Sequence, residues 1–140
     1  MEPQNEKCVL VLDGALPLGL IANTAAILGI SLGKSMPQIV GADVTDHDGN
    51  LHRGIIEFPV PILRADADRL KALRQTLAAP EYAGLTVVDF SNLAQSCKTY
   101  QEFITRMGWA PAAGLQYLGL AICGPKKQVN HLTGNLPLLR

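Results

Sequence analysis

The chain has 140 residues, of which 48% are hydrophobic and 17% are charged. This composition excludes an intrinsically disordered protein, because such a chain cannot bury enough apolar surface to offset the entropy lost on ordering. Lysine and arginine balance aspartate and glutamate at 12 each, so we expect no general nucleic-acid binding and no attraction to an anionic membrane. The length fits one domain covering residues 1–140.

The first predicted elements are a buried strand and an apolar helix. Residues Cys8–Leu12 are apolar without alternation, as in a strand that is covered on both faces. A helix is predicted over about Leu18–Leu32, with Gly33 in the capping position and Lys34 near the negative end of the helix dipole. This helix is apolar around most of its circumference, so we expect it to lie between a sheet and a partner surface.

The same region has to be considered as a membrane span. Over Gly14–Gly33 about twenty residues carry no charge, which is long enough to cross a bilayer. Pro17, several glycines, Asn23 and Thr24 are unfavourable in such a span, and the sequence has no second segment of this kind. We therefore expect a core helix, with Ile27 in a closely packed apolar site, and no membrane span.

The middle of the chain is predicted to form a hairpin, a strand and an amphipathic helix. The polar run Thr45–Asn50 contains residues favoured in tight turns and separates the apolar segments Gln38–Asp43 and Leu51–Glu57. A strand follows at Val60–Leu63. A helix is then predicted over about Asp66–Ala79, with the aspartate as its cap.

The last part of the chain adds two strands and two helices. The strands are predicted at Leu85–Val88 and Leu115–Cys123, and the helices at Thr99–Met107 and within Pro125–Gly134. Strands and helices in this order predict a three-layer α/β/α domain, in which a mixed sheet carries helices on both faces.

The cysteines and the first residues bear on location. Cys8, Cys97 and Cys123 are an odd number and have no CxxC spacing, which suits a reducing cytoplasm. The first residues are acidic and polar where a signal peptide has a basic region. The sequence therefore predicts a cytoplasmic protein.

Three motifs suggest nucleotide or metal binding but do not meet its requirements. The segment Gly29–Ser35 is one residue short of a phosphate loop and lies at the end of a helix, where carbonyl groups point outward. The acidic turn Asp43–Asp48 lacks ligands at two required positions of a calcium loop. His47 and His52 lack further ligands at suitable spacing. We expect no metal site and no cofactor.

Two groups of residues remain as ligand-binding candidates. Ligands of open α/β sheets bind beyond the carboxyl ends of strands, where the first amides of helices are unsatisfied. Asp13, Gly19, Asn23 and Thr24 lie at such a place in the sequence, although Asn23 could equally bond a loop carbonyl.

The second group is the pair Cys97-Lys98. Cys97 is the only cysteine in a polar segment, and reactive cysteines lie in electropositive surroundings of the kind that Lys98 offers. No base lies near Cys97 in the sequence, so an inert surface thiol is the alternative interpretation.

The chain as a whole resembles a known family. Lys7–Lys34 reads as strand, glycine turn and helix, and Leu118–Arg140 as strand, Gly-Pro break, helix and apolar tail. Further shared segments are Asn23–Ala26, Asp46–Gly49, Pro61–Leu63 and Thr133–Arg140. Together they resemble the uncharacterised family called domain of unknown function two thousand, of the peptidyl-tRNA hydrolase II superfamily. The resemblance implies a peptidyl-tRNA hydrolase II-like fold and a homodimer.

The residues on which hydrolase activity depends are absent. The enzymes follow the helix-opening glycine with a catalytic lysine, whereas here Gly19 is followed by Leu20. The segment Gly108–Gly114 lacks the aspartate and threonine that serve the enzymes' active site. We therefore expect a cytoplasmic domain that binds an unidentified small molecule or a partner, and no peptidyl-tRNA hydrolysis. The alternative is a hydrolase of an ester or amide bond that uses Cys97 or Asp13 in the same cleft.

Overall fold

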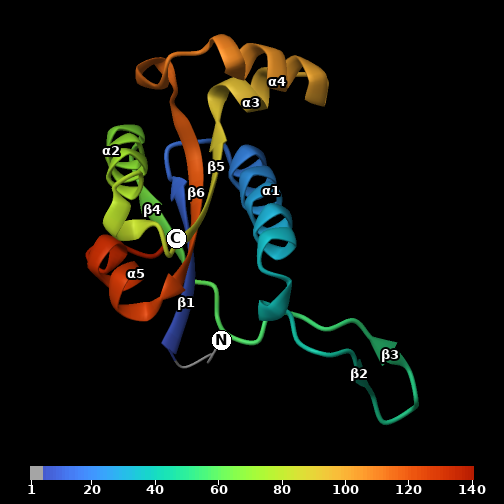
Figure 1. The fold of residues 1–140 in the computed structure, drawn as a ribbon. Helices are drawn as coiled ribbons and strands as arrows, with labels where there is room; N and C mark the ends of the chain where they lie inside the picture. Colours follow the sequence, from blue (N-terminus) through green and yellow to red (C-terminus); the bar gives the residue numbers. More distant parts are fainter. Residues whose placement is uncertain (1–4) are drawn as a thin grey trace.

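In the computed structural model, which describes residues 5–140, a four-stranded sheet carries helices on both faces (Figure 1). The main-sheet strands are β1 (Glu6–Asp13), β4 (Ile62–Ala65), β5 (Thr86–Ser91) and β6 (Tyr117–Pro125), and β2 (Val44–Thr45) pairs with β3 (Leu51–His52). The helices are α1 (Leu18–Ser35), α2 (Ala67–Leu77), α3 (Asn92–Ser96), α4 (Tyr100–Trp109) and α5 (Lys126–Thr133). Short 3-10 helices are η2 (Pro37–Ile39), η3 (Pro80–Tyr82) and η4 (Ala112–Gly114).

The sheet is mixed, and its two long strands are central. The order is β4-β1-β6-β5; β1 is parallel to β4 and antiparallel to β6, and β5 is antiparallel to β6. Side chains of β1 alternate: Cys8, Leu10 and Leu12 belong to the apolar cluster under α1. Val9 and Val11 belong to the cluster under α2 and α5. The predicted single α/β domain with a mixed sheet and a first strand covered on both faces is confirmed.

Helix α1 packs on the sheet through a narrow face. Its buried residues are Thr24, Leu28 and Leu32. A close approach is possible because β6 has glycine at position 119. A Cβ on Gly119 would lie 2.6 Å from Cδ2 of Leu12 and 2.9 Å from Cγ2 of Thr24. A larger residue there would therefore push the helix off the sheet.

Two predictions about α1 are wrong. The helix continues through Gly33 to Ser35, and the amide of Met36 donates to the Leu32 carbonyl at 2.9 Å, so Gly33 is not the cap. Ile27 is half-buried at the edge of the apolar cluster, because it lies beside the face that meets the sheet. Leu28 is fully buried. The predicted place of Lys34 in the last turn is confirmed.

Among residues 5–140, α1 is the one helix long and apolar enough to cross a membrane, judged by its 18 residues and mean hydropathy of 1.3. Only 17% of this segment is buried inside the protein. The helix packs one face on the sheet, and Leu18 and Ile30 on its outer side are exposed.

Helix α2 begins at its predicted cap. Asp66 Oδ1 accepts a hydrogen bond of 2.8 Å from the amide of Arg69, which satisfies one of the free amides at the start of α2. Helix α2 ends at Leu77, slightly earlier than the sequence predicts. Helix α5 spans Lys126–Thr133, within the predicted range, with Pro125 as its N-cap and Gly134 as its C-cap.

The predicted hairpin is confirmed and forms an arm, defined here as residues Val40–Ile56. At its tip the amide of Gly49, with φ of +86°, donates to the carbonyl of Asp46. Asp46 Oδ1 also accepts from the amides of Asp48 and Asn50. The arm leaves the lower end of α1 and projects away from the main sheet (Figure 1). Residues 42–53 are all exposed.

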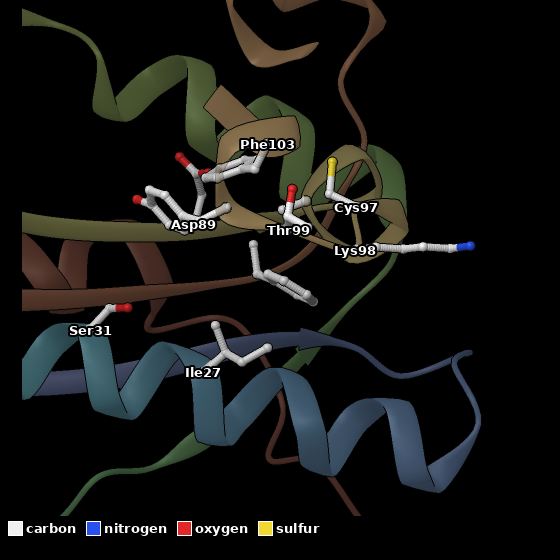
Figure 2. A pocket seen from close by; sticks show the side chains of 10 residues that line it. Ile27, Ser31, Asp89, Cys97, Lys98, Thr99 and Phe103 are labelled. Atoms are coloured by element: carbon white, nitrogen blue, oxygen red, sulfur yellow. The ribbon is translucent and has the colours of Figure 1, made fainter. Parts of the chain in front are cut away.

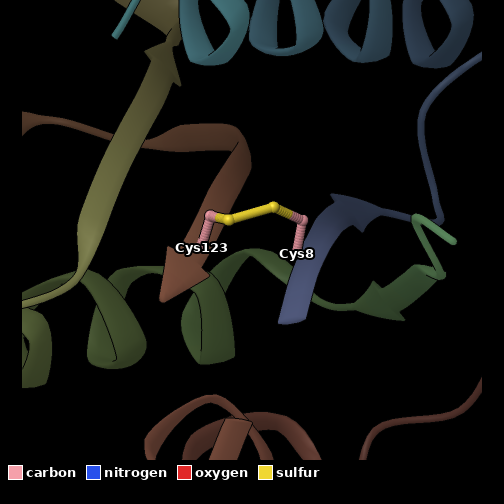
Figure 3. Close-up of a disulfide and its surroundings, with 2 residues drawn as sticks. All are labelled: Cys8 and Cys123. Atoms are coloured by element: carbon pink, nitrogen blue, oxygen red, sulfur yellow. A yellow bond between two sulfur atoms is a disulfide. The ribbon is translucent and has the colours of Figure 1, made fainter. Parts of the chain in front are cut away.

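Two cysteines are joined across the central strands. Cys8 of β1 lies opposite Cys123 of β6, and their sulfur atoms form a disulfide with Cα atoms 4.1 Å apart (Figure 3). Both residues are fully buried. This bond is not predictable from the cysteine spacing, because the partners are 115 residues apart and their pairing depends on strand register. Cys97 is the free cysteine.

Candidate functional site

A cleft of about 470 Å³ lies between α1 and the segment that leads into α4 (Figure 2). Its volume lies within the range of small-molecule sites, about 300 to 1,000 Å³. The cleft is bounded by α1 below, by the end of β5 behind, and by α3 and α4 above. Its lining residues are Ile27, Ser31, Asp89, Phe90, Ala94, Cys97, Lys98, Thr99, Tyr100 and Phe103.

The cleft has an apolar interior. Ile27 points up from α1, toward the α4 segment that carries Phe103 (Figure 2), and Phe90 and Ala94 complete this surface. Phe90 and Ala94 also belong to the cluster under α1 or pack against it. Tyr100 and Phe103 form an edge-on aromatic pair with ring centroids 5.5 Å apart. The rings give the cleft a rigid wall, since aromatic pairs of this geometry attract each other.

Hydrogen-bonding groups without protein partners surround this interior. Within residues 5–140, the Ser31 hydroxyl, the Lys98 ammonium and the Tyr100 hydroxyl make no hydrogen bond or ion pair with another protein group. The Lys98 side chain extends outward from the mouth of the cleft (Figure 2). A ligand whose apolar body fills the cleft could therefore accept hydrogen bonds from these groups at the rim of the cleft. An anionic end of that ligand would meet Lys98.

Caps fix the backbone around the cleft. Ser91 Oγ accepts from the amide of Ala94 at the start of α3, and Thr99 Oγ1 accepts from the amide of Glu102 at the start of α4. The Glu102 carboxylate accepts in return from the amide of Lys98. This reciprocal pair resembles a capping box and holds Lys98 and Thr99 in place.

The thiol of Cys97 is engaged within the α3 and α4 region. Its Sγ donates to the carbonyl of Leu93 at 3.2 Å, and Nη1 of Arg106 lies 3.7 Å from the sulfur. The same guanidinium group donates to Ser96 Oγ and pairs with Glu102. The thiol is thus part of the contact between two helices, as well as of the cleft lining.

The predicted candidates do not converge on one place. Cys97 and Lys98 line the cleft. Gly19 and Asn23 lie on the exposed side of α1. Thr24 is fully buried, and its hydroxyl donates to the Leu20 carbonyl at 2.8 Å. Thr24 is therefore a packing residue, and its polar group is satisfied inside its own helix.

Asp13 lines a different hollow, at the carboxyl ends of the parallel strands β1 and β4. That hollow has a volume of about 410 Å³ and also contains Arg64 and Asp66. Both carboxylates have structural bonds there: Asp13 Oδ1 accepts from the amide of Ala15, and Asp66 caps α2.

On the opposite face of β5, Asp89 pairs with Arg74 of α2 at 3.0 Å. Tyr117 of β6 lies near this pair. Burial raises the pKa of the Tyr117 hydroxyl, the negative charge of Asp89 raises it further, and Arg74 opposes the rise. These groups hold α2 to the sheet and leave the Asp89 carboxylate committed to Arg74, although the residue borders the cleft.

Metal ligands are not gathered in the part of the chain that the structure describes: no group of three or more His, Cys, Asp or Glu side chains is placed to hold an ion. The three histidines lie away from the cleft, two in the arm and His131 on α5.

Sequence reasoning found Cys97 and Lys98 but missed the rest of the lining. Ile27 and Ser31 are four residues apart on α1, and Tyr100 and Phe103 are three apart on α4, so each pair shares a helix face. That spacing shows which residues share a face. It does not show that the two faces oppose each other, which depends on the sheet between them.

Comparisons with known proteins give the fold and the family. The structure is similar to a protein of unknown function, Atu0240 from Agrobacterium tumefaciens strain C58, with a TM-score of 0.85 and 16% sequence identity over 96% of this chain and 97% of that chain. At this identity the likeness shows a shared fold only. No curated protein matches the sequence. The family model described as protein of unknown function (DUF2000) matches residues 6–140. The match spans nearly the whole chain, so this protein belongs to the DUF2000 family.

Proposed function

We propose that this protein binds a small amphipathic molecule in the cleft between α1 and α4. The observation that carries the proposal is the combination of an apolar interior with unpaired polar groups at the rim, among them the Lys98 ammonium. A molecule with an alkyl or aromatic body and a carboxylate end fits both features, because the body leaves water while the charge stays at the mouth beside a cation.

We also propose that the domain is of the peptidyl-tRNA hydrolase II type but does not hydrolyse peptidyl-tRNA. The position that resembles the catalytic lysine is Leu20, which is half-buried and packs against the cluster under α1. An ester hydrolase needs a group that transfers protons, and the loss of such a group lowers the rate about 100- to 10,000-fold. Purified protein incubated with N-acetyl-aminoacyl-tRNA should show at most trace turnover; activity within tenfold of an authentic hydrolase would contradict this.

Binding is favoured over the alternative of a hydrolase with other residues. A cysteine nucleophile needs a base within hydrogen-bond reach, and Cys97 contacts a carbonyl and a guanidinium group instead. Asp13, the other nucleophile considered, lines a separate hollow. A generic ester substrate provides the test: turnover that Cys97→Ser abolishes would replace the binding proposal with the enzymatic one.

Binding is tested by ligand-induced stabilisation. A panel of alkyl and aryl carboxylic acids would be screened by thermal denaturation beside the corresponding amides, since a ligand at a hundred times its Kd adds about 2.7 kcal/mol to the free energy of unfolding. Ser31→Phe should fill the cleft and abolish the stabilisation. Ser35→Phe, one turn later on the exposed end of α1, is the matched control and should keep it.

The variant Lys98→Gln tests whether the Lys98 ammonium meets the anionic end of the ligand. It should weaken binding of the acids about fivefold, as expected for loss of one exposed charge pair worth about 1 kcal/mol, and leave binding of the amides unchanged. Absence of any stabilisation across the panel, or equal stabilisation of Ser31→Phe and the parent, would contradict the proposal.

A cytoplasmic location is a further proposal. The Cys8–Cys123 disulfide of the structure counts against it, because disulfides rarely persist in that compartment; the redox state of these two cysteines in the cell therefore tests it. Cells would be lysed in denaturant with an alkylating reagent and the protein analysed by mass spectrometry. Alkylation of all three cysteines would support a cytoplasmic location; protection of Cys8 and Cys123 with modification of Cys97 alone would contradict it.

A further inference from the structure

The two edges of the main sheet differ. One edge strand, β4, is covered by the C-terminal tail: the amide of Arg64 donates to the Pro137 carbonyl at 2.8 Å. The amide of Leu139 donates in turn to the Ile62 carbonyl at 2.9 Å. The other edge strand, β5, pairs with β6 on one side, and no segment within residues 5–140 pairs with it on the other (Figure 1). An edge of this kind presents a row of unpaired backbone groups.

Strand register shows which backbone groups of β5 bond to β6. The amide of Leu10 in β1 donates to the Pro61 carbonyl just before β4, at 3.1 Å, and so points away from β6. Opposite residues of antiparallel strands exchange either both backbone bonds or none. Ala121 of β6 lies opposite Leu10, so its backbone groups point toward β5. There Ala121 lies opposite Val88, and these two residues exchange their bonds.

The disulfide gives the same register. The Cα atoms of Cys8 and Cys123 are 4.1 Å apart, close to the spacing of about 4.5 Å for a pair without backbone bonds. Cys123 therefore also bonds toward β5, where Thr86 lies opposite. Successive residues of a strand direct their backbone groups to opposite sides. Val87 and Asp89 therefore direct their N–H and C=O groups outward, away from the sheet.

The side chains of β5 are engaged, whereas these outward backbone groups are not. Val88 packs against the apolar cluster under α1, and Phe90 belongs to it. Val87 packs against the cluster under α2 and α5, and Asp89 pairs with Arg74. The free chemistry of this edge is thus a short row of alternating backbone donors and acceptors. An extended polypeptide backbone matches such a row, because it carries the same groups at the same spacing.

The cleft adjoins this edge. Asp89 and Phe90 of β5 line it. Side chains of a strand added to β5 would alternate between the two faces of the sheet. The one that stands beside Phe90 on the α1 face would enter the apolar interior near Ile27. Lys98, at the mouth of the cleft, favours an acidic residue close to that side chain.

We propose that β5 pairs with an extended segment of a partner protein, which adds a strand to the sheet and places one apolar side chain in the cleft. The segment alternates apolar with polar residues, and one of the polar residues is acidic. Its backbone bonds to Val87 and Asp89, and the pairing ends at the irregularity between Phe90 and Ser91, where the register shifts. The proposal rests on the proposed function in one respect, the apolar interior that receives the side chain. The backbone pairing is independent of the small acid.

The probes are short, end-blocked synthetic peptides in which threonine alternates with valine or leucine and one threonine is replaced by glutamate. They would be added to the full chain, and amide hydrogen exchange would be followed by NMR. Exchange at the Val87 and Asp89 amides should slow at least about tenfold on binding, since these amides become hydrogen-bonded. The Val88 amide is already bonded to β6 and should change less.

Peptides methylated on alternate backbone nitrogens test the pairing without changing the protein. One methylated peptide lacks the amide protons that face β5, and it should bind at least about tenfold more weakly. The other lacks the protons that face away, and its affinity should stay within about twofold of the parent peptide. The two peptides cannot exchange roles by slipping one residue, because a slip would turn the apolar side chains to the other face.

Variants at one position of β5 separate this proposal from the small-molecule site. Val87→Pro removes an outward amide but no bond to β6, as edge strands tolerate. It should abolish peptide binding and leave binding of the small acids unchanged. Val87→Thr keeps the amide and the branched side chain, and is the matched control that should bind the peptide normally. If Val87→Pro does not fold, the methylated peptides decide.

The outcomes distinguish the two proposals. Binding of the small acids without any effect of the peptides would overturn the pairing at β5 and leave the proposed function intact. Peptide binding that Val87→Pro abolishes, without binding of the acids, would support the pairing and contradict the proposed function. Equal binding of both methylated peptides, or full binding by a folded Val87→Pro, would overturn the pairing. Protection of the Val87 and Asp89 amides that rises with the concentration of the chain alone would also overturn it, and would assign the edge to a second copy.

Discussion

The two faces of the sheet are covered differently. On one face, α2 and α5 bury apolar stripes formed by Leu70, Leu73, Val129 and Leu132, and their outer sides are polar. On the other face, α1 is apolar inside and outside, and it borders a cleft. The outer sides of α2 and α5 are therefore suited to contact with water and need no further cover. The second face offers a cavity and an uncovered helix, so recognition by this protein is expected on the α1 side.

The largest effect is expected at the inner side of α1. Leu28→Asp would place an unpaired charge among fully buried apolar residues and should cost about 4 kcal/mol or more, which is enough to unfold a marginally stable domain. Ile30→Asp, two residues away on the outer side, should leave the stability of a single chain nearly unchanged. Urea unfolding monitored by circular dichroism compares the two. Equal losses would show that α1 has no distinct inner and outer side.

A smaller effect is expected where α1 approaches the sheet. Gly119→Ala would bring a methyl group within 3.1 Å of side chains from β1 and α1, and overpacking of this kind costs about 1 to 3 kcal/mol. Gly108→Ala in α4 meets no atom within 4 Å and should stabilise its helix by up to about 1 kcal/mol. Thermal unfolding of both variants checks this; stabilisation by Gly119→Ala would mean that α1 is more loosely packed than described.

Two neighbouring residues on α1 separate structure from binding. Thr24→Val removes a buried hydroxyl and its bond to the Leu20 carbonyl and should cost about 1 kcal/mol. Asn23→Ala changes an exposed side chain and should stay within about 0.5 kcal/mol of the parent. Denaturant titrations of both variants measure these two changes in the free energy of unfolding. A larger loss for Asn23→Ala would reveal a bond of the amide that the fold as described does not contain.

The smallest effect concerns the turn of the arm. His52, and then the amide of Asn50, hold the pKa of the Asp46 carboxyl below its usual value. The folded-state pKa is thus lower than the unfolded one, so the charged carboxylate stabilises the turn above the unfolded pKa of about 3.9. This contribution is lost as the pH falls through the folded-state pKa. NMR titration should show the Asp46 pKa rising in His52→Ala; an unchanged pKa would remove His52 as its cause.

The sequence predicted the local elements well, because their signals lie within a few residues of each other. Asp66 before an amphipathic stretch and the polar Thr45–Asn50 run each specify a cap or a turn without reference to the rest of the chain. The prediction that Gly33 caps α1 was wrong for the same reason, because it depended on a local signal alone. Glycine is common just after a helix, but tertiary contacts of Leu32 and Met36 extend this one further.

The site could be predicted only in part. Cys97 and Lys98 stand out by residue type, whereas Ile27 and Phe103 look like ordinary core residues until α1 and α4 face each other. The Cys8 and Cys123 bond was missed because it depends on the register of two strands from opposite ends of the chain. Asn23 and Thr24 are adjacent in the sequence, but the helix directs the Asn23 side chain outward and the Thr24 side chain inward.

The central claim is that the cleft between α1 and α4 binds the apolar body of an amphipathic acid. Methyl NMR titration with the acids of the panel measures this directly. The methyl groups of Ile27 and Ala94, which line the cleft, should shift as the acid is added, whereas the methyl group of Ala72 on the outer side of α2 should not. If Ile27 and Ala94 shift no more than Ala72 at saturating acid, the cleft is not the binding site and the account is wrong.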